Sequence, residues 1–264
     1  MHAVKDLRWK LSLLRSRWTL RLRYACAWPF GYRHWWRVAR AKWGHKTVVI
    51  ELRNGLKYRI RPGTTDLGVI NEAVVLNPYL GPGYLSLPRN AIVVDIGANI
   101  GDFALQCARL CPEGTVYAVE PILEHCEIIR EQIALNGAGN VRVLRFAMGE
   151  SDGQEVRISV AGGKSSLYEN VGPPETVPMT TLDALLSSNG IRQVDLLKMD
   201  CEGAEWQIFP EAEPLLPRIR QICMEYHNGE RTGAWFENWL AERGYNVRRA
   251  PGELWNGALW AWRS

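Results

Sequence analysis

The chain of 264 residues lacks the cysteine patterns of zinc-binding and disulfide-linked proteins. None of its six cysteines forms a C-x-x-C pair, and none of its five histidines lies at zinc-ligand spacing from them. Cys107 and Cys111 are one helical turn apart in an apolar segment, so we expect them to be core residues. Cysteines without a disulfide or zinc-binding pattern favour a reducing compartment, and we predict a cytoplasmic protein.

Long apolar runs and a dinucleotide-binding fingerprint are also missing. No uninterrupted apolar segment approaches the roughly 20 residues that a membrane-spanning helix needs. Arginines interrupt the apolar residues near the start of the chain, which argues against a signal peptide. No G-x-G-x-x-G motif follows a predicted strand, which counts against a dehydrogenase.

Acidic residues are almost absent from one part of the chain. Residues 1–46 contain 12 Lys and Arg and a single acid, whereas residues 47–264 contain 20 Lys and Arg and 27 acids. Half of the 12 tryptophans also lie in residues 1–46. The sequence therefore predicts a basic, Trp-rich arm attached to an acidic body.

The periodicity of this arm predicts a helix over about Val4–Ala25, broken by Pro29 and Gly31, and then a short helix to about Trp43. An apolar stripe flanked by arginines is typical of a helix that lies in a membrane interface. The arm thus indicates peripheral binding to the inner face of a membrane. Two alternatives stay open: the stripe packs on the body or on a second copy, or the basic and aromatic residues bind nucleic acid.

Residues 93–101, V-V-D-I-G-A-N-I-G, indicate the main ligand site. The pattern predicts a buried strand, a tight turn and the start of a helix. Gly97 and Gly101 let the backbone turn sharply and approach a ligand, because they have no Cβ atom. Open α/β sheets bind nucleotides at such turns. The next strand ends at Glu120, an acid that can accept both ribose hydroxyls of an adenosine.

Strands and helices alternate from residue 91 onward, which predicts a parallel sheet with right-handed crossovers. The expected strands are Ile92–Asp95, Thr115–Glu120, Val141–Ala147, Val194–Asp200 and Ile219–Glu225. The expected helices cover about 101–111, 122–136, 181–188, 203–209 and 234–243. An extra strand or hairpin is expected at Gln154–Val160, and Tyr245–Arg249 with Ala258–Trp262 predicts a final antiparallel hairpin. The fold class is therefore α/β, with a seven-stranded, mostly parallel, doubly wound sheet.

A smaller element is expected before this core. Thr47–Leu52 and Leu56–Ile60 predict a hairpin around Asn54-Gly55. A helix capped by Thr64, Thr65 or Asp66 should follow and run to about Leu76. We thus predict three regions: a helical arm at 1–46, a β-hairpin plus helix cap element at 47–90, and a catalytic domain at 91–264.

Several motifs resemble the S-adenosylmethionine-dependent methyltransferases of the seven-stranded Rossmann-like class, and more narrowly the FkbM-type methyltransferase family. They are V-V-D-I-G-A-N-I-G (93–101), V-E-P (119–121), T-L-D-A-L-L (181–186), D-L-L-K-M-D-C-E-G-A-E (195–205), M-E-Y-H (224–227) and R-P-G-T-T-D (61–66). The resemblance covers roughly Leu56 to Trp262 and leaves out the arm. Many members of the class carry G-x-G-x-G in the first turn, where this chain has Asn99 in the middle. Asn tolerates left-handed backbone geometry, so we expect the turn to form.

The resemblance implies S-adenosylmethionine as the cofactor. Its binding residues would be Asp95, Gly97, Ala98, Asn99, Gly101, Glu120, Pro121 and Ala147. Glu120 would take the ribose hydroxyls, and Phe146 and Ala147 would line the adenine.

A second cluster of charged residues follows the fourth and fifth core strands. It consists of Lys198, Asp200, Glu202, Glu205, Glu225 and His227. An acceptor hydroxyl must lose its proton, and we expect His227 or Asp200 to take it while Glu202 orients the acceptor. Glu205 is expected to be structural. Mg²⁺ or Mn²⁺ would suit so many carboxylates, but Lys198 already offers a counter-charge, and we assign no metal ligand.

The resemblance implies an O-methyltransferase acting on a hydroxyl of a sugar, glycan, lipid-linked glycan or other natural product. One rival is a nucleic-acid methyltransferase that uses the basic arm. It is disfavoured because D-C-E-G stands where an Asn/Asp-Pro-Pro-aromatic motif would be expected, and because an acidic cluster repels phosphates. The other rival is a non-catalytic, membrane-associated adaptor with a degenerate methyltransferase fold. No oligomeric state is predicted.

Overall fold

The computed structural model describes residues 28–43, 45–80, 82–161, 164–166, 174–227, 233–250 and 256–263. The predicted arm helix at Val4–Ala25 lies outside them. Residues 28–31 are helical and α3 spans Trp35–Trp43, so the first helical segment ends at Gly31 and a second helix follows, as predicted, although Pro29 lies within the first segment. The break comes at Tyr32, which is buried and forms a β-bridge with Leu52. Pairing with a distant strand therefore sets this boundary.

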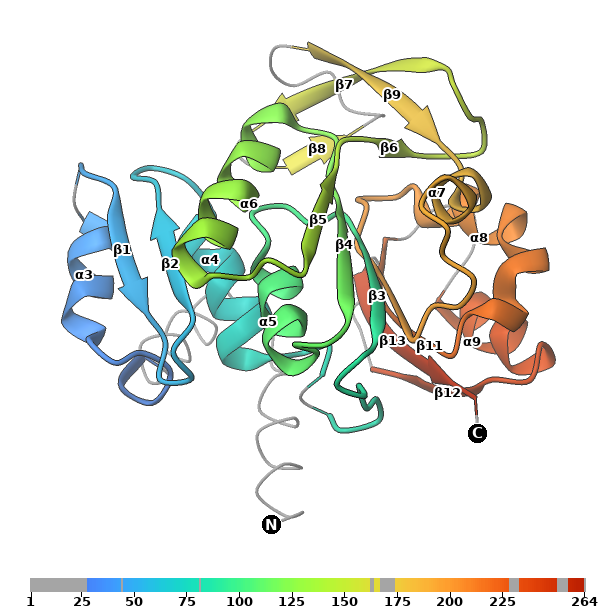
Figure 1. Cartoon of the computed structure of the whole chain (residues 1–264), viewed down its shortest axis with the longest axis horizontal. Coiled ribbons are helices and arrows are strands. Elements are labelled where there is room, and N and C mark those ends of the chain that lie inside the picture. The colour runs from blue at the N-terminus through green and yellow to red at the C-terminus, as the bar shows by residue number, and fades with distance from the viewer. Residues whose placement is uncertain are drawn as a thin grey trace.

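A seven-stranded sheet forms the centre of the molecule, in the order β12-β13-β11-β10-β3-β4-β5 (Figure 1). Its strands are β3 (Ile92–Ile96), β4 (Thr115–Val119), β5 (Val141–Leu144), β10 (Leu196–Met199), β11 (Gln221–His227), β12 (Asn246–Arg249) and β13 (Asn256–Trp262). The five strands from β5 to β11 pair in parallel, and β13 runs antiparallel to both β11 and β12. The predicted mostly parallel sheet with a terminal antiparallel hairpin is confirmed.

Helices cover both faces of this sheet (Figure 1). One layer contains α5 (Asp102–Leu110) and α6 (Leu123–Asn136), and the other contains α7 (Leu182–Ser188), α8 (Glu205–Glu211) and α9 (Gly233–Glu242). A 3₁₀-helix, η2 (Glu213–Arg218), follows α8. Val93 packs in the core cluster of α5, whereas Val94 packs in that of α7 to α9. Successive strand residues face opposite sides, so both faces are buried and ligand sites are left to the carboxyl edge.

A second sheet contains four short strands in the order β6-β9-β7-β8. They are β6 (Ala147–Met148), β7 (Glu155–Ala161), β8 (Lys164–Ser166) and β9 (Pro174–Thr180). The single strand predicted at Val141–Ala147 is therefore wrong, because β5 ends at Leu144 and the chain leaves the central sheet. Arg145 lies where the chain leaves the sheet, and its guanidinium donates hydrogen bonds to the carbonyl of Pro121 and to the carboxylate of Glu175. β6 then pairs with β9, which the sequence did not predict.

A small antiparallel hairpin precedes the core, as predicted. It consists of β1 (Val48–Glu51) and β2 (Lys57–Ile60), and α4 (Asp66–Ile70) follows it. The helix expected to run to Leu76 changes at residue 71 into a π-helix, η1 (Asn71–Leu76). Asn77 ends it with a left-handed φ of 51°. π-Helical segments often mark functional sites.

Two amide side chains of α6 fix the hairpin to the core. Gln132 accepts from the N–H of Arg59 and donates to its carbonyl, at 2.9 and 3.0 Å. Asn136 makes the same pair of bonds with Lys57, at 2.8 and 2.7 Å. These bonds satisfy the backbone of an edge strand that would otherwise be unpaired. The division into regions at 46/47 and 90/91 stays a prediction.

No helix in the part of the chain that the structure describes is long and apolar enough to cross a membrane.

Candidate functional site

A cavity of about 350 Å³ opens at the carboxyl edge of the central sheet. This volume falls in the range of small-molecule sites. The structure brings together eight predicted site residues in its lining: Gly97, Asn99, Glu120, Pro121, Ala147, Asp200, Glu202 and His227. The other three, Asp95, Ala98 and Gly101, are not among the lining residues. Asp95 is paired with Lys198, Ala98 donates its N–H to the carbonyl of Val119, and Gly101 donates its N–H to the carbonyl of Ala98.

The glycine turn between β3 and α5 has the backbone that the sequence predicted. Gly97, Asn99 and Gly101 have φ values of 75°, 49° and 81°. A Cβ atom at Gly97 would overlap the backbone carbonyl oxygen of Asp200, so only glycine fits there. The N–H groups of Gly97 and Ala98 both donate to the carbonyl of Val119 at 3.0 Å. The turn is therefore held between the ends of β10 and β4.

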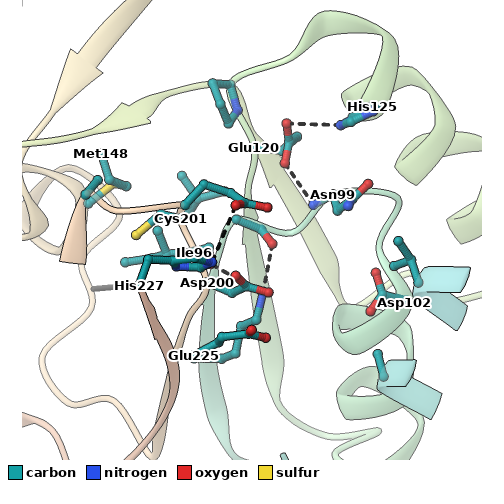
Figure 2. Close-up of a pocket in the computed structure, with 18 of the residues that line it drawn as sticks. Ile96, Asn99, Asp102, Glu120, His125, Met148, Asp200, Cys201, Glu225 and His227 are labelled. Atoms are coloured by element: carbon teal, nitrogen blue, oxygen red, sulfur yellow. Dashed lines mark hydrogen bonds and ion pairs between the residues drawn. The ribbon is translucent and has the colours of Figure 1, made fainter. Parts of the chain in front are cut away.

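Glu120 connects this turn to the start of α6. Its Oε2 accepts from the N–H of Asn99 at 2.8 Å, and its Oε1 accepts from the N–H of Ile122 at 3.1 Å. His125 Nδ1 lies 3.3 Å from the same Oε1 (Figure 2). The side chain of Glu120 is only 4% exposed, yet it lines the cavity. Since each carboxylate oxygen has two lone pairs, Glu120 can still accept hydrogen bonds from a ligand.

A buried ion pair lies under the turn. Lys198 Nζ is 3.1 Å from Asp95 Oδ1 and donates to the carbonyl of Gly97 at 2.8 Å. Burial lowers the pKa of Lys198, but Asp95, Asp200 and Asp102 raise it further, so the net shift is upward and the ammonium stays charged. Asp95 thus acts on the turn through Lys198.

Asp200 is positioned by a residue that the sequence analysis missed. The hydroxyl of Tyr79 donates to Asp200 Oδ2 at 3.0 Å. Burial, and then the charge of Asp200, raises the pKa of Tyr79 well above its ordinary value, so this proton stays on the phenol. The carbonyl of Tyr79 accepts from the indole N–H of Trp260 at 2.9 Å. Tyr79 lies in a Pro- and Gly-rich segment with no local pattern, so only long-range contacts reveal its role.

His227 lies between two acids at the end of β11. Its Nδ1 is 3.3 Å from Glu205 Oε1, and its Nε2 is 3.4 Å from Glu202 Oε2. Burial lowers the pKa of His227, but Glu205, Asp200 and Glu202 raise it more, to about 9. The imidazole is therefore protonated near neutral pH. Figure 2 shows His227, Asp200 and Glu225 on the same side of the cavity, as expected for neighbouring strands β10 and β11.

Glu205 holds the loop that carries Glu202. It is completely buried and accepts from the N–H groups of Cys201 and Gly203 at 2.9 and 3.0 Å. Glu202 has a left-handed φ of 52°. Such a conformation costs about 1–3 kcal/mol for a non-glycine residue and persists only where its surroundings impose it. The fully satisfied Glu205 provides that constraint.

The cavity has an apolar end and an acidic end. Val119, Phe146, Met148 and Ile158 line it beyond Glu120, on the side of β6 and β7. Phe146 and Ala147 thus lie at this apolar end. The acidic end contains Asp200, Glu202 and Glu225, together with Glu72 and Asp102, which the sequence analysis did not select. Among the described residues, no group of three or more His, Cys, Asp or Glu is arranged to hold a metal ion.

Comparisons with known proteins identify the family of this chain. The chain matches the family model described as the methyltransferase FkbM domain over residues 95–247, which is more than half of its length. "Methyltransferase sdnD" of Sordaria araneosa is 26% identical over 64% of this chain and 78% of its own length. "2-O-methyltransferase NoeI" of Sinorhizobium fredii is 25% identical over 65% of this chain and 74% of its own.

Two further matches are partial. "AMB antimetabolite synthetase AmbE" of Pseudomonas aeruginosa is 27% identical over 63% of this chain, which spans only 10% of that protein's length. A crystal structure of methyltransferase FkbM from Methylobacillus flagellatus KT is 15% identical, with a TM-score of 0.48 over 74% of this chain and 53% of that one. The family match over residues 95–247 includes the glycine turn, Glu120, Asp200 and His227. The chain belongs to the FkbM family and is an S-adenosylmethionine-dependent methyltransferase.

Proposed function

We propose that this chain is an O-methyltransferase that methylates a hydroxyl of a sugar, glycan or related natural product. One observation carries the proposal: a single cavity contains both Glu120, beside the glycine turn, and Asp200, beside Tyr79. The first suits a nucleoside and the second suits an attacking hydroxyl. The printed name of the Sinorhizobium fredii relative, a 2-O-methyltransferase, supports the choice of a hydroxyl acceptor.

The residues present fit S-adenosylmethionine. The apolar end at Phe146, Ala147 and Met148 suits an adenine, and Glu120 suits the two ribose hydroxyls. The carboxylates at the other end suit a positively charged sulfur. When bound, the cofactor supplies a methyl group that is already activated by this sulfur. The protein therefore has to position the two reactants and take up one proton.

Asp200 is our candidate for the proton acceptor. A hydroxyl within hydrogen-bond reach of its free oxygen would pass its proton there as it attacks the methyl carbon. Tyr79 holds the other oxygen and so fixes the orientation of the carboxylate. His227 is a poorer base near neutral pH, because its pKa of about 9 keeps both ring nitrogens protonated. We assign it to positioning Glu202, which faces the acceptor.

Replacing Glu120 tests the cofactor site. In Glu120→Ala, the ribose hydroxyls lose a charged acceptor and the N–H of Asn99 loses its partner. We expect the affinity for S-adenosylhomocysteine, measured by titration calorimetry, to fall about 10- to 100-fold. Glu127→Ala, at an exposed position of the helix α6 that follows Glu120, is the control. Unchanged affinity in Glu120→Ala would show that the nucleoside binds elsewhere.

Replacing Asp200 tests the chemistry. The Asp200→Asn side chain keeps its size but cannot take a proton. We expect formation of S-adenosylhomocysteine in the presence of a panel of mono- and oligosaccharides to slow about 10²- to 10⁴-fold. The affinity for S-adenosylhomocysteine should change little. Glu211→Gln, at an exposed position of α8, controls for the loss of a negative charge. Full turnover by Asp200→Asn would rule out its role as the base.

His227 should make stability depend on pH. Its folded pKa of about 9 is above the ordinary value of 6.5. The resulting stability, on the order of 3 kcal/mol, is therefore fully present below pH 6.5 and is lost as the pH rises through 9. Urea unfolding of the wild type and of His227→Gln at pH 6 and pH 9.5 measures this difference. If both proteins lose the same stability between these pH values, His227 is not held as an imidazolium.

We also propose that residues 1–46 bind the inner surface of a membrane and bring the enzyme to a lipid-linked acceptor. Phe30, Trp35 and Trp36 are 76%, 47% and 51% exposed, and Arg37 and Arg40 beside them are exposed as well. Aromatic rings next to cations suit the interface of an anionic bilayer.

Flotation of the full chain with anionic phospholipid vesicles tests this membrane proposal. We expect the Trp35→Ala/Trp36→Ala double variant to be recovered with the vesicles several-fold less than the wild type. Leu110→Ala/Leu123→Ala removes two other exposed apolar side chains and should behave like the wild type. Equal recovery of all three proteins contradicts the proposal.

A further inference from the structure

One wall of the cavity is the helix formed by α4 and η1. This helix and its cap residue contribute Thr65, Gly68, Val69, Glu72 and Ala73 to the lining. Residues three or four positions apart lie on the same side of a helix, so these five share one face. The wall therefore presents a continuous surface to whatever occupies the cavity.

Away from the cavity, buried polar side chains fix this helix to the rest of the protein. Asp66 accepts from the guanidinium of Arg61 at 2.7 and 3.1 Å, and Asn71 accepts from the hydroxyl of Tyr32 at 2.7 Å. Asp66 is 1% exposed and Asn71 is 2% exposed. These bonds hold the wall in place, and Gly68 takes no part in them.

Gly68 is a glycine that the protein itself does not require. It lies inside α4 and, unlike Gly97, has no positive φ. A Cβ atom at Gly68 would have no atom from another part of the chain within 4 Å, whereas one at Gly97 would overlap the backbone. Glycine is among the least favourable residues inside a helix. The helix thus gives up stability to leave exposed backbone and open space at the cavity wall, and this space is available to a ligand.

The π-helical part of the wall borders the same space as the candidate proton acceptor. Glu72 lies in η1, and π-helical segments often mark functional sites. After burial, the charges of Asp200, Glu225 and Glu72 raise the pKa of Tyr79, so Glu72 lies near the phenol that positions Asp200. The carboxylates that line the whole cavity are those of Glu72, Asp102, Glu120, Asp200, Glu202 and Glu225.

We infer that Gly68 makes room for the acceptor, and that the acceptor is a neutral ring with hydroxyl groups along its edge, such as a pyranose. The inference rests on the proposed function, in which Asp200 takes the proton of the acceptor hydroxyl. The ring would lie against the backbone of α4 at Gly68. Thr65 and Glu72, about one turn before and after Gly68, would accept hydrogen bonds from its hydroxyls. An acidic acceptor is disfavoured, because the carboxylates that line the cavity would repel it.

Adding a side chain at Gly68 tests this inference. A methyl group fills the space in Gly68→Ala, and Gly68→Leu fills more of it. We expect Gly68→Ala to raise the melting temperature by about 1–4 °C, because alanine favours the helix. For the saccharide that the wild type methylates best in the panel, we expect kcat/KM to fall about 10- to 100-fold in Gly68→Ala and further in Gly68→Leu. The affinity of both variants for S-adenosylhomocysteine, measured by titration calorimetry, should match that of the wild type.

Gly139→Ala is the control for this test. Gly139 is also exposed, has no positive φ and has open space at its Cβ position, but it does not line the cavity. This variant should match the wild type in kcat/KM and in affinity for S-adenosylhomocysteine.

Each contrary outcome has a distinct meaning. Unchanged kcat/KM in Gly68→Leu would show that the acceptor does not use this space. An equal loss of affinity for S-adenosylhomocysteine would assign the space to the cofactor, and a lower melting temperature in Gly68→Ala would make the glycine structural; either result overturns the inference. If the wild type binds S-adenosylhomocysteine but methylates no saccharide of the panel, the proposed function fails, and the inference fails with it.

Discussion

The close crossing of the glycine turn over the end of β10 is the constraint on which the rest of this site depends. Gly97 lies so near the backbone carbonyl of Asp200 that no side chain fits between them. The same turn is held by Val119 from β4 and by Lys198 from β10. Because three adjacent strands fix one short segment, the residues that follow each strand are brought to a single cavity. The turn thus sets where Glu120 and Asp200 lie relative to each other.

The second organising feature is a set of buried charged side chains, most of which have a partner within the protein. Lys198 is paired with Asp95, His227 lies between Glu202 and Glu205, and Glu120 accepts two backbone N–H groups. Replacing a whole pair of this kind by apolar residues is often neutral, but losing one partner is expensive. Their benefit here is a rigid, negatively charged surface facing a cationic cofactor.

The sequence predicted those parts of the site that local chemistry determines. Patterns within a few residues predicted the strand and glycine turn at 93–101, the acid at Glu120, and the D-C-E-G loop with His227. Eight of the eleven predicted site residues line one cavity. Tyr79 and Asp102 were missed because distant residues, Trp260 and Tyr58, position them. The split of Val141–Ala147 into β5 and β6 depends on pairing with β9. Tertiary contacts of this kind leave no local signature.

A crystal structure of the full chain with S-adenosylhomocysteine tests the central claim most directly. The account requires the adenine against Phe146 and Ala147, the ribose hydroxyls within hydrogen-bond distance of Glu120, and the sulfur facing Asp200. A nucleoside bound outside this cavity, or one whose ribose does not touch Glu120, would contradict it.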